Sequence, residues 1–166
     1  MLIYYPNTFL TNFSFRLCLR NSWSATVVFE SSCRYTTVDN RNQDDFVKLF
    51  GIRKSPWPTN TRVNGAYLAW CYVPEGDKIR AAWYLHDRNG SFKFMTKTDA
   101  PLFDIGKPVS LSLINHDESF DFQLGDVKAE IEKAKYGIDN FKQGWSLQPW
   151  GGGTETIGHT RRVQLN

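Results

Sequence analysis

The sequence lacks the long apolar segments that mark membrane and secreted proteins. No stretch approaches the roughly 20 consecutive apolar residues that a transmembrane helix requires, so we predict no membrane insertion. The segment Met1–Asn7 has no basic start, no uninterrupted apolar run and no small-residue cleavage site. A secretory signal peptide needs all three features. We therefore expect a protein made in the cytoplasm without a signal peptide.

Cysteine is scarce, and its spacing is unsuited to metal binding. The three cysteines, Cys18, Cys33 and Cys71, lie far apart, and structural zinc sites and thioredoxin-like redox sites both use closely spaced Cys-x-x-Cys pairs. We predict neither a metal nor a cofactor. A reducing compartment is the simpler interpretation, and a single disulfide is the alternative.

Blocks of like charge are also missing. Twenty Lys and Arg residues against 17 Asp and Glu residues give a net charge of +3, and the basic residues are scattered. Dedicated nucleic-acid binders concentrate their basic residues in patches or stripes. We predict that nucleic acid is not a partner.

Motifs that identify an enzyme are absent as well. There is no Gly-x-Ser-x-Gly nucleophile elbow and no His-Glu-x-x-His metal motif. The three histidines, His86, His116 and His159, are widely separated. The glycine run before Thr154 lacks the lysine of a phosphate-binding loop. We predict no catalytic residues, and enzyme activity is the minority interpretation.

Aromatic residues, in contrast, are abundant at 15%, with 12 Phe, 7 Tyr and 6 Trp. Many of them lie in segments whose side chains alternate between apolar and polar, which is typical of strands with one buried face. The clearest such segments are Gly65–Val73 and Lys78–Asp87, joined by the turn-forming Pro74–Asp77. They predict a β-hairpin at the centre of the fold.

Similar segments recur through the chain with turn signals between them, giving about ten strands at the 8–12-residue spacing of sandwiches and barrels. The sequence predicts an all-β fold, an antiparallel jelly-roll-like β-sandwich formed by a single domain over residues 1–166. One short helix is expected near residues 43–50, because Phe46, Leu49 and Phe50 share a helical face and Gly51 follows them.

Three short segments of the sequence resemble those of a known protein family. They are Lys48-Leu49-Phe50-Gly51, the Asn89-Gly90 turn after the second hairpin strand, and the aromatic, glycine-rich segment 147–152. Their order resembles that of poorly characterised small bacterial and phage jelly-roll proteins. The segment Ile157–Thr160 departs from the Ala-Pro-His found there. The resemblance implies a sandwich related to glycan-binding modules, and fold alone does not determine function.

The polar faces of the predicted strands supply the candidate ligand-binding residues. Arginine and tyrosine offer planar hydrogen-bond donors and stacking surfaces, which suit sugars or acidic groups. A jelly roll would gather several such residues on one concave surface, and two tryptophans beside prolines could stack on a ligand at its rim. The strand candidates are Arg16, Arg80, Tyr84, His86, Gln123 and Arg162, and the rim candidates are Trp57 and Trp150.

Three functions are compatible with this pattern. The first is a non-catalytic structural, decoration or attachment component of a larger assembly, such as a phage virion, with protein partners that include other copies of the chain. The second is a lectin-like carbohydrate-binding domain that uses Arg80, Tyr84 and His86. The third is a small glycan lyase or hydrolase on the same face.

Overall fold

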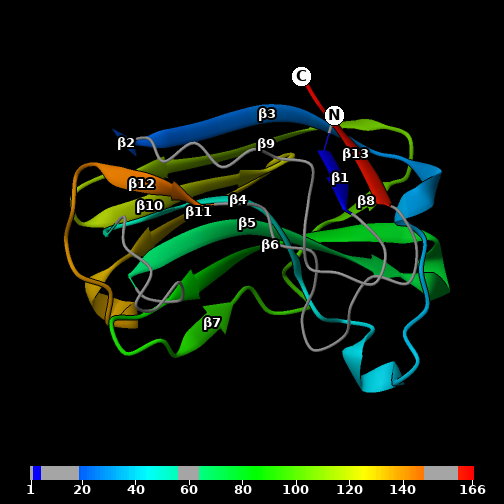
Figure 1. Cartoon of the computed structure of the whole chain (residues 1–166), viewed down its shortest axis with the longest axis horizontal. Helices are drawn as coiled ribbons and strands as arrows, with labels where there is room; N and C mark the ends of the chain where they lie inside the picture. Colours follow the sequence, from blue (N-terminus) through cyan, green and yellow to red (C-terminus); the bar gives the residue numbers. More distant parts are fainter. Residues whose placement is uncertain (1, 5–18, 56–63, 148–160) are drawn as a thin grey trace.

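The computed structural model describes residues 2–4, 19–55, 64–147 and 161–166. Within these ranges the chain forms two antiparallel sheets that stack face to face (Figure 1). Short 3-10 turns are the helical elements among the described residues. The predicted antiparallel, jelly-roll-like β-sandwich is confirmed.

One sheet has six strands in the order β1-β13-β3-β9-β10-β11. Every pairing along it is antiparallel, and β1 and β11 are its edges. Its strands are β1 (Leu2–Tyr4), β13 (Arg161–Leu165), β3 (Ser22–Phe29), β9 (Pro108–Asn115), β10 (Ser119–Leu124) and β11 (Val127–Glu132).

The other sheet has seven strands, six of them in the order β2-β12-β4-β5-β6-β7. The seventh, β8, pairs with the first half of β6, and β7 pairs with its second half. The strands are β2 (Leu19–Arg20), β12 (Gly144–Leu147), β4 (Val47–Arg53), β5 (Gly65–Val73), β6 (Lys78–His86), β7 (Phe92–Phe94) and β8 (Leu102–Asp104).

The predicted central hairpin is formed by β5 and β6. It keeps one register from Gly65 opposite His86 to Val73 opposite Lys78. The connection is a 3-10 turn, η3 (Pro74–Gly76), followed by Asp77 in the left-handed conformation at φ 49°. This regular register fixes which side chains of the hairpin share a face.

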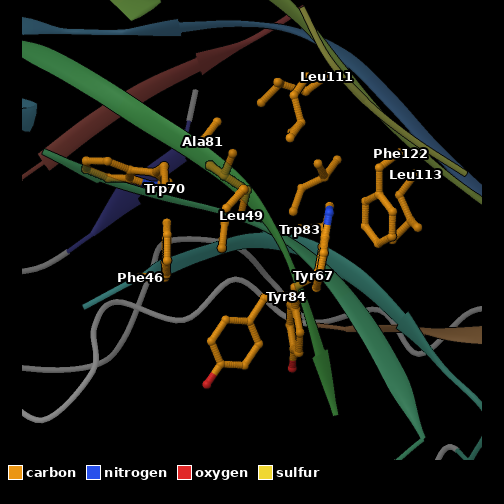
Figure 2. Close-up of a cluster of buried hydrophobic side chains, with 14 of the residues drawn as sticks. Phe46, Leu49, Tyr67, Trp70, Ala81, Trp83, Tyr84, Leu111, Leu113 and Phe122 are labelled. Carbon is orange, nitrogen blue, oxygen red and sulfur yellow. The ribbon is translucent and has the colours of Figure 1, made fainter. Parts of the chain in front are cut away.

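The hydrophobic core lies between the two sheets. Figure 2 shows Trp83 of the seven-stranded sheet close to Phe122 of the other sheet, and their ring centroids are 6.4 Å apart. Phe29 and Trp70 make a second contact between the sheets, at 5.2 Å. Aromatic side chains bury large apolar areas, so such pairs are well suited to filling the space between two sheets.

The prediction of a helix near residues 43–50 is wrong, because residues 47–53 form the strand β4. The pairing of β4 with β5 shifts between Lys48 and Phe50, so the consecutive residues Leu49 and Phe50 are both buried. This irregularity produces a spacing that resembles a helical face. Gly51 does not end a helix. A Cβ atom there would lie 2.3 Å from the Ala66 carbonyl oxygen, so glycine allows the strands to approach closely.

Other expected elements are confirmed in part. The Asn89-Gly90 turn leads into β7, and Gly125, at φ 62°, forms the turn between β10 and β11. Strand β8 lies between Asp99 and Pro108, where two prolines predict a loop. Alternation over residues 13–20 predicts a first strand, of which only Leu19 and Arg20 lie within the described residues.

Candidate ligand-binding site

The outer face of the seven-stranded sheet holds three of the predicted site residues. Arg80, Tyr84 and His86 alternate along β6 with residues of the core, so they project away from the six-stranded sheet. Figure 2 shows Tyr84 and its neighbour Tyr67 on this side of the strands, away from Phe122. The prediction that Arg80, Tyr84 and His86 share a face is confirmed.

Their accessibility is lower than the sequence suggests. Tyr84 is 8% exposed and His86 is 5% exposed. His86 lies between two tyrosine rings, with centroid distances of 6.1 Å to Tyr67 and 5.1 Å to Tyr84. These two side chains lie beneath the surface of the face, so a molecule from solvent would contact more exposed residues before it reached them.

Arg162 and Gln123 do not join this group. Arg162 lies on β13 and Gln123 on β10, and both strands belong to the six-stranded sheet. The expectation that several of the strand candidates gather on one surface therefore does not extend to these two residues. Alternation along a strand predicts which side chains point away from the core, but it does not predict to which of the two sheets the strand belongs. Arg16, Trp57 and Trp150 lie outside the described residues.

Two phenylalanines complete the face, and sequence analysis gave them no role. Strand β7 pairs with the end of β6, which places Phe94 opposite Tyr84 and Phe92 opposite His86. Phe92 is 55% exposed and Phe94 is 39% exposed. The alternation of Phe92, Lys93 and Phe94 directly after the Asn89-Gly90 turn is the sequence signal that could have identified them.

Tyr84, Phe92 and Phe94 form a surface that we call the aromatic triad. The centroid distances are 5.7 Å between Tyr84 and Phe92, 5.9 Å between Tyr84 and Phe94, and 6.2 Å between the phenylalanines. The ring planes are within 16° of one another. Three nearly parallel rings stacked at similar separations make one compact apolar platform, of which the exposed parts of Phe92 and Phe94 meet the solvent.

A lysine borders the platform on the β4 side. The Lys48 ammonium lies 4.2 Å from the centroid of the Tyr84 ring, within the range of a cation–π interaction. It also donates a hydrogen bond of 3.0 Å to the Phe46 carbonyl oxygen. The Phe46 ring packs against Phe94 at 5.5 Å. These contacts hold a positive charge beside the aromatic triad.

A group of charged side chains lies further along β6. The Asp44 carboxylate pairs with the Arg80 guanidinium at 3.1 Å and also with the Lys97 ammonium. Arg80 is largely buried, whereas half of the Lys97 side chain is exposed. The carboxylate therefore orients both cations, and the exposed parts of Lys97 and Asp44 offer accessible donors and an accessible acceptor on this sheet.

Arg53 adds a buried cation to the same face. It lies opposite Gly65 on β5, and Gly65 lies opposite His86 on β6. Desolvation by burial lowers the pKa of the Arg53 guanidinium, and the nearby Tyr67 acts in the opposite direction. An arginine remains charged at neutral pH even so, so the face has a buried positive charge beside His86.

Among the described residues, no group of three or more His, Cys, Asp or Glu side chains is arranged to hold a metal ion. The described part of the chain also contains no helix that is both long and apolar enough to cross a membrane. The chemistry that the outer face can offer is thus stacking, hydrogen bonding and charge.

No protein-family model matches the sequence, and no curated protein matches it. Solved structures with similar arrangements include the homodimeric agglutinin CG-16 from chicken liver, with a TM-score of 0.41 and 10% identity over 91% of this chain and 100% of that chain. An ancestral congerin gives a TM-score of 0.36 and 15% identity over 99% of this chain and 98% of that chain.

A third structure is a Bacteroides ovatus mixed-linkage glucan GH16 protein in complex with its product. It gives a TM-score of 0.44 and 10% identity over 90% of this chain and 68% of that chain. The functional proposal below rests on the geometry of the aromatic triad and its neighbours.

Proposed function

We propose that the protein is a lectin-like carbohydrate-binding module and that the aromatic triad is its stacking platform. The observation that carries this proposal is the combination of three nearly parallel rings, of which Phe92 and Phe94 are solvent-exposed, with charged donors and an acceptor on the same sheet. Ligand sites combine apolar surface with a few well-placed polar groups.

A pyranose ring matches this combination chemically. Its C–H groups form an apolar face that can lie flat on an aromatic ring, while its hydroxyl groups point outward and exchange hydrogen bonds. Phe92 and Phe94 present the accessible apolar surface. Lys97 can donate to sugar hydroxyl oxygens, and Asp44 can accept from hydroxyl groups. The geometry thus supplies both parts of sugar recognition within one region.

Binding is better supported than catalysis on this face. A lyase or hydrolase would need His86 or Tyr84 to touch the reacting atoms. Both side chains are almost completely buried, at 5% and 8% exposure. We therefore propose His86 as a residue that supports the platform from below, through its contacts with Tyr67 and Tyr84.

The sequence also led to the hypothesis of a structural component in a larger assembly, such as a virion. One observation favours a protein partner: β7 is an edge strand whose three residues are all exposed, and such edges are ready docking sites for other strands. This is the second proposal. Light scattering distinguishes the two, because an assembly component should form a stable oligomer that is unchanged by sugars.

The test of carbohydrate binding is a double substitution, Phe92→Ala with Phe94→Ala. We expect the affinity for the glycan that the wild-type chain selects from an oligosaccharide panel to fall at least about tenfold, since stacking on aromatic rings contributes roughly 1–3 kcal/mol per ligand ring. Isothermal titration calorimetry gives the affinity, and near-ultraviolet circular dichroism reports whether the core is intact.

Ile114→Ala is the matched control. Ile114 is also an exposed large apolar residue, at 39% exposure, and it lies on β9 of the six-stranded sheet, away from the aromatic triad. Its replacement should leave glycan affinity unchanged. Equal affinities of the double variant and the wild-type chain would reject the aromatic triad as the site. A chain that binds no glycan of the panel would reject the proposed function.

A further inference from the structure

The two sheets differ in the charges that their strands carry. Within the strands as described, the seven-stranded sheet has one acidic residue, Asp104 on β8. Its basic residues are Arg20, Lys48, Arg53, Lys78, Arg80 and Lys93. The six-stranded sheet is balanced, with basic residues Lys128, Arg161 and Arg162 and acidic residues Asp121, Glu130 and Glu132.

We infer that the ligand of the aromatic triad is an anionic glycan, an oligosaccharide whose rings carry carboxylate or sulfate groups. This inference rests on the proposed function and specifies its ligand class. The net charge of the chain is only +3, so the excess of basic residues in one sheet comes from their distribution along the chain. An uneven charge distribution of this kind attracts ligands of opposite sign.

The basic residues nearest to the rings are placed to meet such groups. Lys48 lies over Tyr84 at the border of the aromatic triad. Arg80 and Lys97 converge on the Asp44 carboxylate from two different segments. Asp44 pairs with both cations, and about half of the Lys97 side chain remains exposed, so its ammonium can also meet a charged group from solvent. A ligand carboxylate or sulfate can contact the exposed Lys97 while its sugar ring lies on Phe94.

A glycan fits this face better than a nucleic acid, although nucleic acids are also anionic and stack on aromatic rings. Asp44 lies in the middle of the charged group, and a DNA strand, whose sugars carry no free hydroxyl groups between phosphates, offers this carboxylate few hydroxyl donors. The same carboxylate accepts hydrogen bonds from sugar hydroxyl groups. Uronates and sulfated sugars offer hydroxyl groups beside each anionic group, so they can satisfy both the cations and Asp44.

The experiment compares three oligosaccharides of equal length, one neutral, one built of uronates and one sulfated, by calorimetry with the full chain. We expect at least one anionic oligosaccharide to bind about tenfold or more tightly than the neutral one. This preference should shrink when the salt concentration is raised from about 50 mM to about 300 mM, because salt screens exposed charges.

Lys97→Ala tests the position of the anionic group, and Lys128→Ala is its control. Both changes remove one exposed lysine, and Lys128 lies on β11 of the other sheet. We expect Lys97→Ala to weaken binding of the anionic glycan several-fold and to leave binding of the neutral glycan unchanged. Lys128→Ala should change neither affinity.

Each other result overturns the inference in a distinguishable way. A neutral glycan that binds as tightly as the anionic ones would leave the proposed function intact and reject the ligand class. Tighter binding of a single-stranded oligonucleotide at the same salt concentration would assign the basic face to nucleic acid instead. Loss of all glycan binding would reject both the inference and the proposed function. Equal effects of Lys97→Ala and Lys128→Ala would show that the affinity for the anionic glycan depends on the overall charge of the chain and not on the position of Lys97.

Discussion

Lys133 is a fully buried lysine, and its surroundings explain how the fold accommodates it. Its ammonium donates hydrogen bonds to the carbonyl oxygens of His116, Asp117 and Phe141, at 2.5, 2.9 and 2.8 Å. The aromatic rings of Phe120 and Phe141 lie 4.6 and 3.9 Å from the same nitrogen. A buried charge is costly unless such partners compensate for the lost water. Lys133 therefore joins the segment after β11 to the turn before β10.

The stability of the protein should depend on pH through this residue. Burial lowers the pKa of Lys133 from 10.5 to about 8. Between these two values the unfolded chain binds more protons than the folded chain, so the contribution of Lys133 to the free energy of unfolding increases as the pH rises through this window. For this change in pKa the full rise amounts to roughly 3 kcal/mol.

Lys133→Met isolates this contribution, because other groups titrate equally in both chains. Urea unfolding at pH 7.5 and at pH 10 gives the free energy of unfolding of each chain. The wild-type value should rise relative to the Lys133→Met value at the higher pH. If the difference in free energy of unfolding between the wild-type and Lys133→Met chains does not change with pH, the three carbonyl groups keep the pKa of Lys133 near its ordinary value.

Sequence analysis predicted the arrangement of the candidate residues only where alternation along a strand was sufficient. Arg80, Tyr84 and His86 were predicted correctly to share a face, because a regular strand fixes the orientation of its side chains. The exposed members of the aromatic triad, Phe92 and Phe94, were missed. Their importance depends on the pairing of β7 with β6, and pairing partners cannot be derived from one strand alone.

Strand β4 shows how a local irregularity misleads prediction at the level of an element. The register shift between Lys48 and Phe50 puts two consecutive residues in the core, which a regular strand would not do. Strand β8 was missed for a different reason. It is three residues long and follows Pro101 closely, so its pattern is too short to distinguish from a loop.

Gly51 in β4 should be intolerant of substitution. A Cβ atom there would lie 2.3 Å from the Ala66 carbonyl oxygen and 2.8 Å from Cδ1 of Tyr67. Gly51→Ala must therefore push β4 away from β5 or displace the Tyr67 ring below the binding face. We expect a loss of about 1–3 kcal/mol in the free energy of unfolding, measured by urea denaturation.

Gly76→Ala in the hairpin turn is the control for this substitution. The nearest heavy atom to its added Cβ would be Cγ of Lys78, at 3.4 Å, which is an ordinary contact. Stability should change by less than about 0.5 kcal/mol. If Gly51→Ala were as mild as Gly76→Ala, the close approach of β4 and β5 would not constrain the sheet.

At the scale of the whole molecule, the two sheets depend on each other through aromatic contacts in the core. Phe29 of β3 is fully buried and packs against Trp70 of β5. Phe29→Ala should lower the free energy of unfolding by about 3–5 kcal/mol, because it leaves a cavity between the sheets. Urea unfolding followed by tryptophan fluorescence and by circular dichroism measures the loss.

Val38→Ala provides the comparison, since Val38 is fully exposed and its replacement should change stability by less than about 0.5 kcal/mol. We also expect the two spectroscopic probes to give coincident transitions for Phe29→Ala, because the sheets share one core. Two separate transitions would contradict this interdependence and show that one sheet persists without the other.

The overall architecture was the most predictable property of this chain. Alternating segments such as Gly65–Val73 and turn signals such as Gly125-Asp126 identify strands and their ends locally. The distribution of strands between the sheets was not predictable in this way. Arg162 illustrates the consequence: its strand, β13, pairs with β1 and β3, so this candidate lies in a different layer from Arg80.

Strand β7 gives the proposed site a thermodynamic character of its own. It is three residues long, and within the described part of the chain it pairs on one side, with β6. Short edge strands open easily, and their local unfolding requires far less free energy than unfolding of the whole domain. We therefore expect the parallel arrangement of the three rings to be lost whenever β7 opens, well before the domain unfolds. Under the proposed function, part of the binding free energy would be used to order β7, and a ligand on Phe92 and Phe94 would stabilise this edge of the sheet.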